Sequence, residues 1–451
     1  MKEEKEELVH FDSFYDKERI QGSKAILVGV FRSHEEEPIA KDHLDELELL
    51  AKTHRIPVVE RFCTIIRDFS PATFLSAGKV DMLQEKILET GANLIIFDDE
   101  ISPVQQRNLE RHFKLPVMDR TEVILGVFAD RAKTKEAKLQ IELAQMNYLS
   151  PRLKRMWLHL SRQHGGGGGA GGGGYLRGKG EKQIEMDRRM IKRRLEHLQA
   201  ELKTISEYRH TQRRKRERNA IPVFAIIGYT NAGKSTLLNR LTSANVLVED
   251  MLFATLDTTT RHFALPNHQK VLLTDTVGFI RKLPHLLVAA FKSTLEEAIE
   301  ADVLIHLIDS SHPLALEQAK TTFEVLEELH AKEHPIITAI NKCDLAESVP
   351  GQKAIIQKLR LSYPRSVQLS ALTGEGLSDL FGQMIDVIKD WRKRIFVKIP
   401  QSEYHLMATV IREGNIFSKE YDGNAILVDV ELPLIYAEQL SPYIVGAKDE
   451  H

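Results

Sequence analysis

The stretch VFAIIGYTNAGKSTLLNRLT, residues 223–242, decides the fold of the central part of this chain. Its first residues are apolar, as in a buried strand, and its last residues have the spacing of a helix. Between them, residues 228–235 fit the pattern GxxxxGK[ST], whose glycines allow a tight turn that points backbone N–H groups at a phosphate. A strand, a loop and a helix in this order predict a phosphate-binding P-loop domain.

The residue types in this loop indicate their separate roles. Lys234 would reach the β- and γ-phosphates, and the Ser235 hydroxyl would bind Mg²⁺. Asn231 can either place a K⁺ ion near the phosphates or brace the loop, and the sequence leaves both roles open. We expect the nucleotide to contact the whole loop and the start of its helix: Gly228, Tyr229, Thr230, Asn231, Ala232, Gly233, Lys234, Ser235 and Thr236.

Three later motifs identify the nucleotide. In DTVG, Asp275 would complete the magnesium shell and the Gly278 N–H would contact the γ-phosphate. In NKCD, Asp344 can accept hydrogen bonds from the ring N–H and the amino group of guanine, a pair of donors that adenine lacks. Sites built on such bonds reject an analogue without them by roughly 10⁴-fold or more, so the motifs predict GTP and GDP as ligands. The third motif is SAL at residues 370–372, whose Ala371 N–H would meet the carbonyl of the base. The expected base contacts are Asn341, Lys342, Asp344, Ser370, Ala371 and Leu372.

GTP hydrolysis requires a first switch segment, which contacts Mg²⁺ and the γ-phosphate, and a water molecule positioned for attack. The segment MLFATLDTTTR, residues 251–261, offers four threonines for a switch that binds Mg²⁺ and the γ-phosphate, and of these we expect Thr255 to be the ligand. Phe279 stands where many small GTPases have a glutamine that orients the attacking water, so we expect slow hydrolysis that a partner stimulates strongly. The expected catalytic residues are Lys234, Thr255 and Gly278, and the expected metal ligands are Ser235, Thr255 and Asp275.

Residues 25–130 alternate short apolar runs with helical patterns, which predicts a parallel β/α domain. One helix start is marked by Ser102 as N-cap, Pro103 in the first turn and Gln105 as the capping-box partner. The acidic run 98–100 could hold a metal, but carboxylates between a strand and a helix are more often turn and cap residues.

Long helical patterns begin near residue 134. Ile184, Ile191, Leu198 and Ile205 repeat every seven residues, and this predicts an antiparallel coiled-coil hairpin with AKLQIELAQMNYL as its other arm. The loop between the arms, residues 164–183, is rich in glycine and contains several basic residues. Residues 152–218 contain 19 Lys and Arg against 7 Asp and Glu, so this segment carries plus 12 while the remainder carries minus 14.

Such an asymmetry is typical of a polyanion site, although a solvated helix face would also explain it. Glycine lets a backbone approach phosphates closely, but the glycine tract at 165–174 can equally be a mere spacer. We expect the RNA contacts to be made by basic residues of the hairpin and its loop: Arg162, Arg177, Lys179, Lys182, Arg188 and Arg189.

The fold class is therefore a multidomain α/β protein. We expect an N-terminal parallel β/α domain (1–133), an antiparallel helical hairpin (134–218), a P-loop G domain with a Ras-like fold (219–393) and a small α+β C-terminal domain (394–451). Only Cys63 and Cys343 are present, which disfavours disulfides and zinc and favours a reducing compartment. The apolar runs are too short to span a membrane. We expect a cytoplasmic monomer that associates peripherally with ribosomes or membrane.

The chain resembles the HflX family of translational GTPases in strings that cover nearly its whole length, among them FDDEISPVQQRNLE, SPRLKRMW, GYTNAGKSTLLNRLT and DTVGFIRKLP. The resemblance implies a Mg²⁺-dependent GTPase that binds the large ribosomal subunit and its rRNA in the GTP form. It further implies that the hairpin loop lies near the peptidyl transferase centre, that idle or stalled ribosomes are split, and that ribosomes activate hydrolysis.

Some positions depart from the family pattern. Lys179 and Lys182 replace the proline and threonine of the usual RGPGETQLE, and Lys282 and Leu286 stand where acidic residues are common. A second function stays open on the sequence alone: a GTP-regulated RNA-binding module that acts as a large-subunit assembly or quality-control factor without splitting ribosomes.

Overall fold

The computed structural model describes residues 22–152, 189–207, 221–242, 252–253, 259–284, 300–329, 331, 333–345 and 348–446. The chain forms two compact units. The first consists of residues 1–204 with 251–253 and 283–291, and the second consists of the remainder. The predicted fold class is confirmed, because a parallel β/α region, a P-loop domain and a C-terminal α+β domain are all present.

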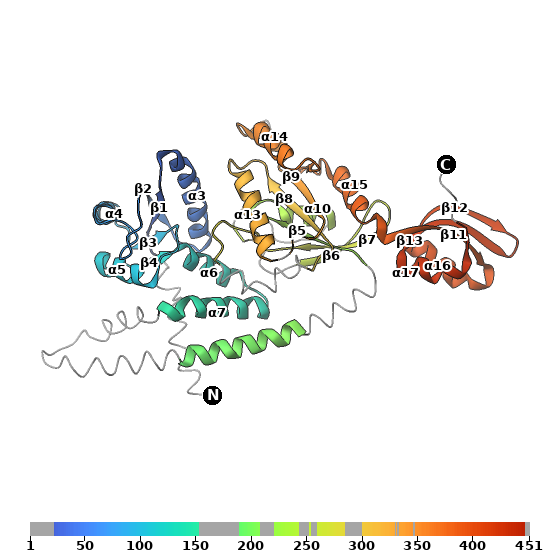
Figure 1. The fold of residues 1–451 in the computed structure, drawn as a ribbon, viewed down its shortest axis with the longest axis horizontal. Helices are drawn as coiled ribbons and strands as arrows, with labels where there is room; N and C mark the ends of the chain where they lie inside the picture. Colours follow the sequence, from blue (N-terminus) through green and yellow to red (C-terminus); the bar gives the residue numbers. More distant parts are fainter. Residues whose placement is uncertain are drawn as a thin grey trace. The chain divides into compact units, whose positions relative to one another are not determined.

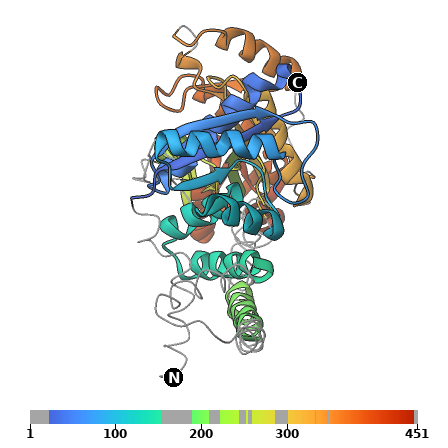
Figure 2. The same ribbon diagram turned by 90° about the vertical axis from the view of Figure 1, so that its left-hand side faces the viewer.

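The N-terminal sheet is fully parallel. Its strands β1 (Ala25–Phe31), β2 (Val58–Ile65), β3 (Leu94–Phe97) and β4 (Val117–Asp119) have the order β2-β1-β3-β4. Helices α4 (Ala77–Thr90) and α5 (Pro103–Phe113) cover one face, and α3 (Glu37–Thr53) and α6 (Arg120–Arg131) cover the other (Figures 1 and 2). Because both faces are covered, the central strands β1 and β3 are apolar, as the sequence pattern predicted, whereas the edge strand β2 also contains Glu60, Arg61 and Thr64.

Two local features of this domain concern the capping box and the acidic run. The capping box is confirmed, since the Ser102 hydroxyl accepts from the Gln105 N–H and the Gln105 side chain accepts from the Ser102 N–H. In the acidic run, Asp98 is buried and pairs with Arg120 at 2.8 Å, and Arg120 also pairs with Glu46 at 2.6 Å. Among the described residues no cluster of His, Cys, Asp and Glu is suited to a metal ion.

The antiparallel hairpin is confirmed in the part that the structure describes. Helix α7 (Lys135–Leu149) is joined to the helix of residues 189–207 by two ion pairs, Glu142–Arg194 at 2.6 Å and Lys135–Glu201 at 3.0 Å. The earlier residue of α7 pairs with the later residue of the second helix, so the two helices run in opposite directions. Figure 1 shows them side by side. Ile191 and Leu198 of the predicted seam are buried.

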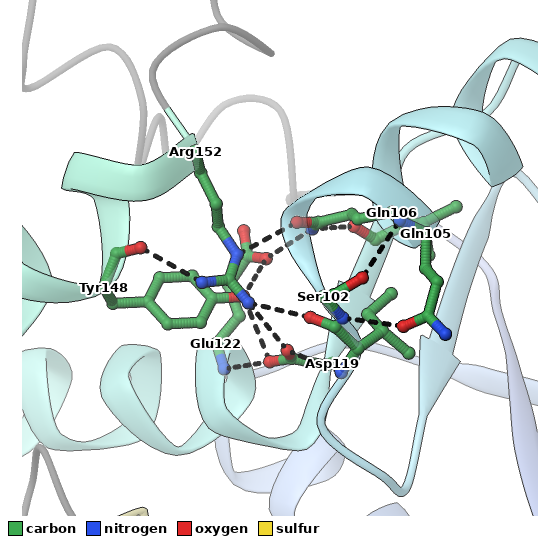
Figure 3. Close-up of polar contacts among 9 residues, drawn as sticks. Ser102, Gln105, Gln106, Asp119, Glu122, Tyr148 and Arg152 are labelled. Carbon is green, nitrogen blue, oxygen red and sulfur yellow. Dashed lines mark hydrogen bonds and ion pairs between the residues drawn. The ribbon is translucent and has the colours of Figure 1, made fainter. Parts of the chain in front are cut away.

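A buried polar network fixes the end of α7 to the N-terminal domain (Figure 3). Asp119 caps α6 by accepting from the Glu122 N–H at 3.0 Å, and the Tyr148 hydroxyl lies 3.1 Å and 3.2 Å from the two carboxylates. Arg152, in the 3₁₀ turn η2 (Ser150–Arg152), donates to the side chain of Gln106 at 3.1 Å. Burial, reinforced by the neighbouring Glu122 carboxylate, raises the pKa of Asp119 to about 6.

The second unit contains a six-stranded sheet with the order β10-β9-β8-β5-β7-β6. Only β6 is antiparallel to its neighbour. The strands are β5 (Val223–Gly228), β6 (Thr259–Ala264), β7 (Lys270–Asp275), β8 (Val303–Asp309), β9 (Ile336–Asn341) and β10 (Val367–Gln368). The helices are α10 (Lys234–Thr242), α13 (Ala315–Glu328), α14 (Gln352–Ser362) and α15 (Leu377–Val387). Since parallel strands end at one edge, the loops after β5, β7, β8 and β9 converge there.

The C-terminal part is a small antiparallel sheet packed on two helices. Strands β11 (Arg392–Pro400), β12 (Asn415–Asp422), β13 (Ala425–Pro433) and β14 (Ile444–Gly446) have the order β12-β13-β11-β14. Helices α16 (Tyr404–Glu413) and α17 (Leu434–Gln439) supply Met407, Val410 and Ala437 to its core. Within the parts of the chain that the structure describes, no helix combines the length and apolarity needed to cross a bilayer.

The raised pKa of Asp119 predicts a pH-dependent local stability. Its carboxyl has a pKa of about 6 in the folded protein and about 4 in an unfolded chain. The folded state therefore holds the proton more tightly, so this contribution to stability is complete below pH ~4 and is lost as the pH rises through ~6. Between these limits we expect the free energy of local opening of α6 to fall by up to about 3 kcal/mol more in the wild type than in Asp119→Asn.

Hydrogen exchange of α6 amides, corrected for the intrinsic rate at each pH, measures this difference. Asn keeps an oxygen that can accept from the Glu122 N–H but does not titrate. Parallel pH profiles for the wild type and Asp119→Asn would show that Asp119 keeps its ordinary pKa.

Candidate functional site

The P-loop has the shape that its glycines require. Gly233 has φ +95°, and a Cβ atom there would lie 2.4 Å from Asn341 Nδ2, so a larger residue would be strained and would also clash. Asn231, two residues before Gly233, adopts a left-handed φ of +61°. The loop thus folds tightly over the end of β5, as the spacing of the motif predicts.

The lysine expected to bind phosphate lies along the loop. Lys234 is buried, and its Nζ donates to the carbonyl oxygens of Gly228 at 3.2 Å and Tyr229 at 2.7 Å. Burial lowers the pKa of this amine to about 8, against the opposing effect of the Asp275 carboxylate. A phosphate placed beside the loop would restore the preference for the charged form.

Two of the expected metal ligands lie together. The Ser235 hydroxyl at the start of α10 donates to Asp275 Oδ2 at the end of β7, at 2.7 Å. A hydroxyl and a carboxylate are hard oxygen donors, the type that Mg²⁺ prefers, so this pair fits that ion. The third expected ligand, Thr255, lies outside the described residues.

The side chain of Asn341 joins the loops expected to bind the base to the P-loop. Asn341 is buried, its Nδ2 donates to the Ala232 carbonyl at 2.8 Å, and its Oδ1 accepts from the Ala371 N–H at 2.9 Å. Asp344, in the short turn η3 (Cys343–Leu345), is exposed. Its carboxylate is therefore accessible to a guanine base. The structure therefore brings the P-loop, NKCD and SAL motifs together at one edge of the sheet.

Some residues that shape this site carry no signal in the local sequence. Arg240, near the end of α10, donates to the Thr373 carbonyl at 2.6 Å and so holds the turn that follows Ser370, Ala371 and Leu372. The two partners are 133 residues apart. Asp309 at the end of β8 pairs with Lys342 at 2.7 Å. Neither Arg240 nor Asp309 belongs to a motif, and only the fold reveals their contacts.

The segment after Asp275 lies directly on the P-loop. The Phe279 N–H donates to the Gly228 carbonyl at 3.1 Å, and the Phe279 carbonyl accepts from the Thr230 N–H at 2.7 Å. The Tyr229 hydroxyl accepts from the Arg281 N–H at 2.7 Å. Phe279 itself is 1% exposed. These bonds extend the pairing of β5 with β7 onto the nucleotide loop.

Gly278 makes this close approach possible. A Cβ atom at this position would lie 2.9 Å from both Lys234 Nζ and Thr230 Cα. Such a distance is far inside van der Waals contact, so only glycine fits in this arrangement. The residue expected to sense the γ-phosphate thus lies close to Lys234 and Thr230 of the P-loop.

Of the six expected RNA contacts, the structure describes only Arg189, which is exposed on the helix of residues 189–207. The other five, Arg162, Arg177, Lys179, Lys182 and Arg188, lie outside the described residues.

Comparison with known proteins agrees with this site. The chain is 46% identical over 423 residues to the GTPase HflX of Chlamydia pneumoniae, covering 94% of this chain and 88% of that protein. It is 44% identical over 410 residues to the GTPase HflX of Lacrimispora saccharolytica, covering 91% of this chain and 93% of that protein. The chain belongs to the HflX family of GTPases. Its HflX membership and its P-loop fold establish that it hydrolyses GTP.

Family models divide the same chain into regions. The GTP-binding GTPase N-terminal region matches residues 41–129, the GTP-binding GTPase middle region matches 131–216, and a 50S ribosome-binding GTPase model matches 223–342. A GTP-binding protein from Sulfolobus solfataricus, solved in complex with GDP, is 26% identical with a TM-score of 0.40, and the match covers 82% of this HflX chain and 99% of that protein.

The double hydrogen bond of Asn341 predicts a large loss of affinity in Asn341→Ala. The change leaves the Ala232 carbonyl and the Ala371 N–H without their buried partner, and each such loss costs about 1–3 kcal/mol. Calorimetry with GDP should therefore show binding weaker by about 30-fold or more. As a matched control, Asn267→Ala removes a hydrogen bond to the Gln269 N–H in the β6–β7 turn of the same domain. Equal GDP affinities for the wild type and Asn341→Ala would mean that the three loops assemble without this side chain.

Proposed function

We propose that this HflX protein is a Mg²⁺-dependent GTPase that binds the large ribosomal subunit in its GTP form and dissociates idle or stalled ribosomes, with hydrolysis stimulated by the ribosome. The match of residues 223–342 to a 50S ribosome-binding GTPase model supports the partner. The plus 12 charge of residues 152–218 supports a polyanion such as rRNA as the surface that is bound.

The observation that carries the proposal is the contact of Gly278 and Phe279 with the P-loop. In a GTP complex the γ-phosphate lies beside the P-loop lysine and receives the N–H of the DxxG glycine. Here Gly278 is packed against Lys234, and Phe279 uses the Thr230 N–H and the Gly228 carbonyl. A γ-phosphate needs room between Lys234 and Gly278, so its arrival would separate the two and release Phe279.

This separation would give GTP and GDP different affinities for the closed and open arrangements of the loop, which a nucleotide switch needs. A ligand can shift a conformational equilibrium only by its differential affinity for the two states. GDP lacks the γ-phosphate and is compatible with the closed contact, whereas GTP favours the open one. The released segment would have Phe279 freed from Gly228 and Thr230, and Arg281 freed from Tyr229. It would be the element by which the ribosome distinguishes the GTP form from the GDP form.

The metal and the hydrolysis step follow from the same residues. Ser235 and Asp275 would hold Mg²⁺, with Thr255 as the ligand from the first switch, and the ion would neutralise charge on the phosphates. Asn231 would either hold a K⁺ ion that adds positive charge near the phosphates or brace the loop. Phe279 has no group that can orient the attacking water. We infer that the ribosome supplies such a group or positions the water itself.

The basic hairpin would make the RNA contact. Arg189 is exposed at the start of the described part of the second helix, which pairs with α7 through Arg194 and Glu142. Arg162, Arg177, Lys179, Lys182 and Arg188 are the further proposed contacts.

The test is sedimentation of 70S ribosomes with the purified protein in sucrose gradients, with a non-hydrolysable GTP analogue or with GDP. We expect the protein to comigrate with the large subunit and the 70S peak to fall only with the analogue. Equal occupancy of the large subunit with both nucleotides would contradict the proposed switch. Occupancy that depends on GTP but leaves the 70S peak intact would favour an assembly or quality-control factor instead.

A further inference from the structure

The lysine of the NKCD motif is fixed by an acidic residue outside all four nucleotide motifs. Asp309 is the last residue of β8 and is 8% exposed, and its Oδ2 lies 2.7 Å from Lys342 Nζ. Its other oxygen, Oδ1, accepts from the Ser311 N–H at 2.9 Å and from the Ser311 hydroxyl at 2.6 Å. The carboxylate is therefore held in one orientation, with a single oxygen directed at the lysine.

The backbone of Lys342 is held from another direction. Lys342 has a left-handed φ of +62°, which costs energy for a residue with a Cβ atom and persists only where neighbours enforce it. Its carbonyl accepts from Gln352 Nε2 at 2.8 Å, and Gln352 is fully buried at the start of α14. The same amide group donates to the Ser310 hydroxyl at 2.8 Å.

Both ends of the lysine side chain are thus defined before a nucleotide binds. The Cα is fixed by the braced backbone, and the amine is fixed by Asp309, so the methylene stem between them has few rotamers left. Lysine loses much rotamer freedom when it becomes ordered, and ordering it in advance removes that loss from the binding step.

We propose that Asp309 is a positioning residue for guanine-nucleotide binding, and that it acts by holding the Lys342 amine so that the Lys342 stem lies ready along the plane of the base. Asp309 acts through Lys342 and not by touching the nucleotide. This role concerns base binding alone and does not depend on the proposed action on ribosomes.

The first test compares the full-length wild type with Asp309→Asn by calorimetry with GDP and with inosine diphosphate (IDP). We expect Asp309→Asn to weaken both ligands by about fivefold. The two losses should be equal, because the stem contacts the ring that both bases share. The preference for GDP over IDP depends on the amino group read by Asp344 and should not change. As a matched control, Asp386→Asn removes an exposed acid–lysine pair in the same domain and should leave both affinities unchanged.

A double-mutant cycle separates positioning from a general effect on folding. In a Lys342→Met background, which keeps the stem and removes the amine, Asp309→Asn should change GDP affinity by less than about twofold. Asp309→Glu keeps a carboxylate and should recover part of the loss, which provides a second variant if the amide perturbs the fold. An equal loss in the wild-type and Lys342→Met backgrounds, a change in the GDP to IDP preference, or no loss in Asp309→Asn would each overturn the proposal.

Discussion

Backbone hydrogen bonds between the P-loop and Phe279 are the contacts on which the proposed nucleotide switch depends. They exist because β5 and β7 are parallel neighbours, with Ile226 beside Asp275, so that the segments following the two strands leave the sheet together. Gly278 then lies against Lys234 with no room for a side chain. In the proposed switch, this contact occupies the place of the γ-phosphate, and GTP binding would open it.

The base and phosphate halves of the site are built differently. On the base side, the buried side chains of Asn341 and Gln352 and the Asp309–Lys342 ion pair hold the loops in place. On the phosphate side, the closed contact consists mainly of a few backbone hydrogen bonds, each worth about 0.5–1.5 kcal/mol net. Phosphate binding can offset losses of that size. We propose that the guanine loops form a preorganised platform and that the segment after Asp275 is the part that responds to the nucleotide.

Local chemistry made much of this predictable from the sequence. The capping box at Ser102 and Gln105, the P-loop glycines and the seam through Ile191 and Leu198 depend on residues close in the chain, and all are confirmed. Contacts that depend on sheet order were not predictable. Arg240 and Thr373, Asp309 and Lys342, and Asp119 and Tyr148 meet only after the strands have been placed. The choice of Thr255 among the switch threonines stays a prediction, since it lies outside the described residues.

The most direct test of the switch is a pair of crystal structures of this protein, one with GDP and one with Mg²⁺ and a non-hydrolysable GTP analogue. The measurement is the distance from the Thr230 amide nitrogen to the Phe279 carbonyl oxygen, which is 2.7 Å here. We expect this hydrogen bond to persist with GDP and to be broken with the analogue, at a separation beyond about 3.5 Å. An intact bond with a γ-phosphate bound beside Lys234 would contradict the switch.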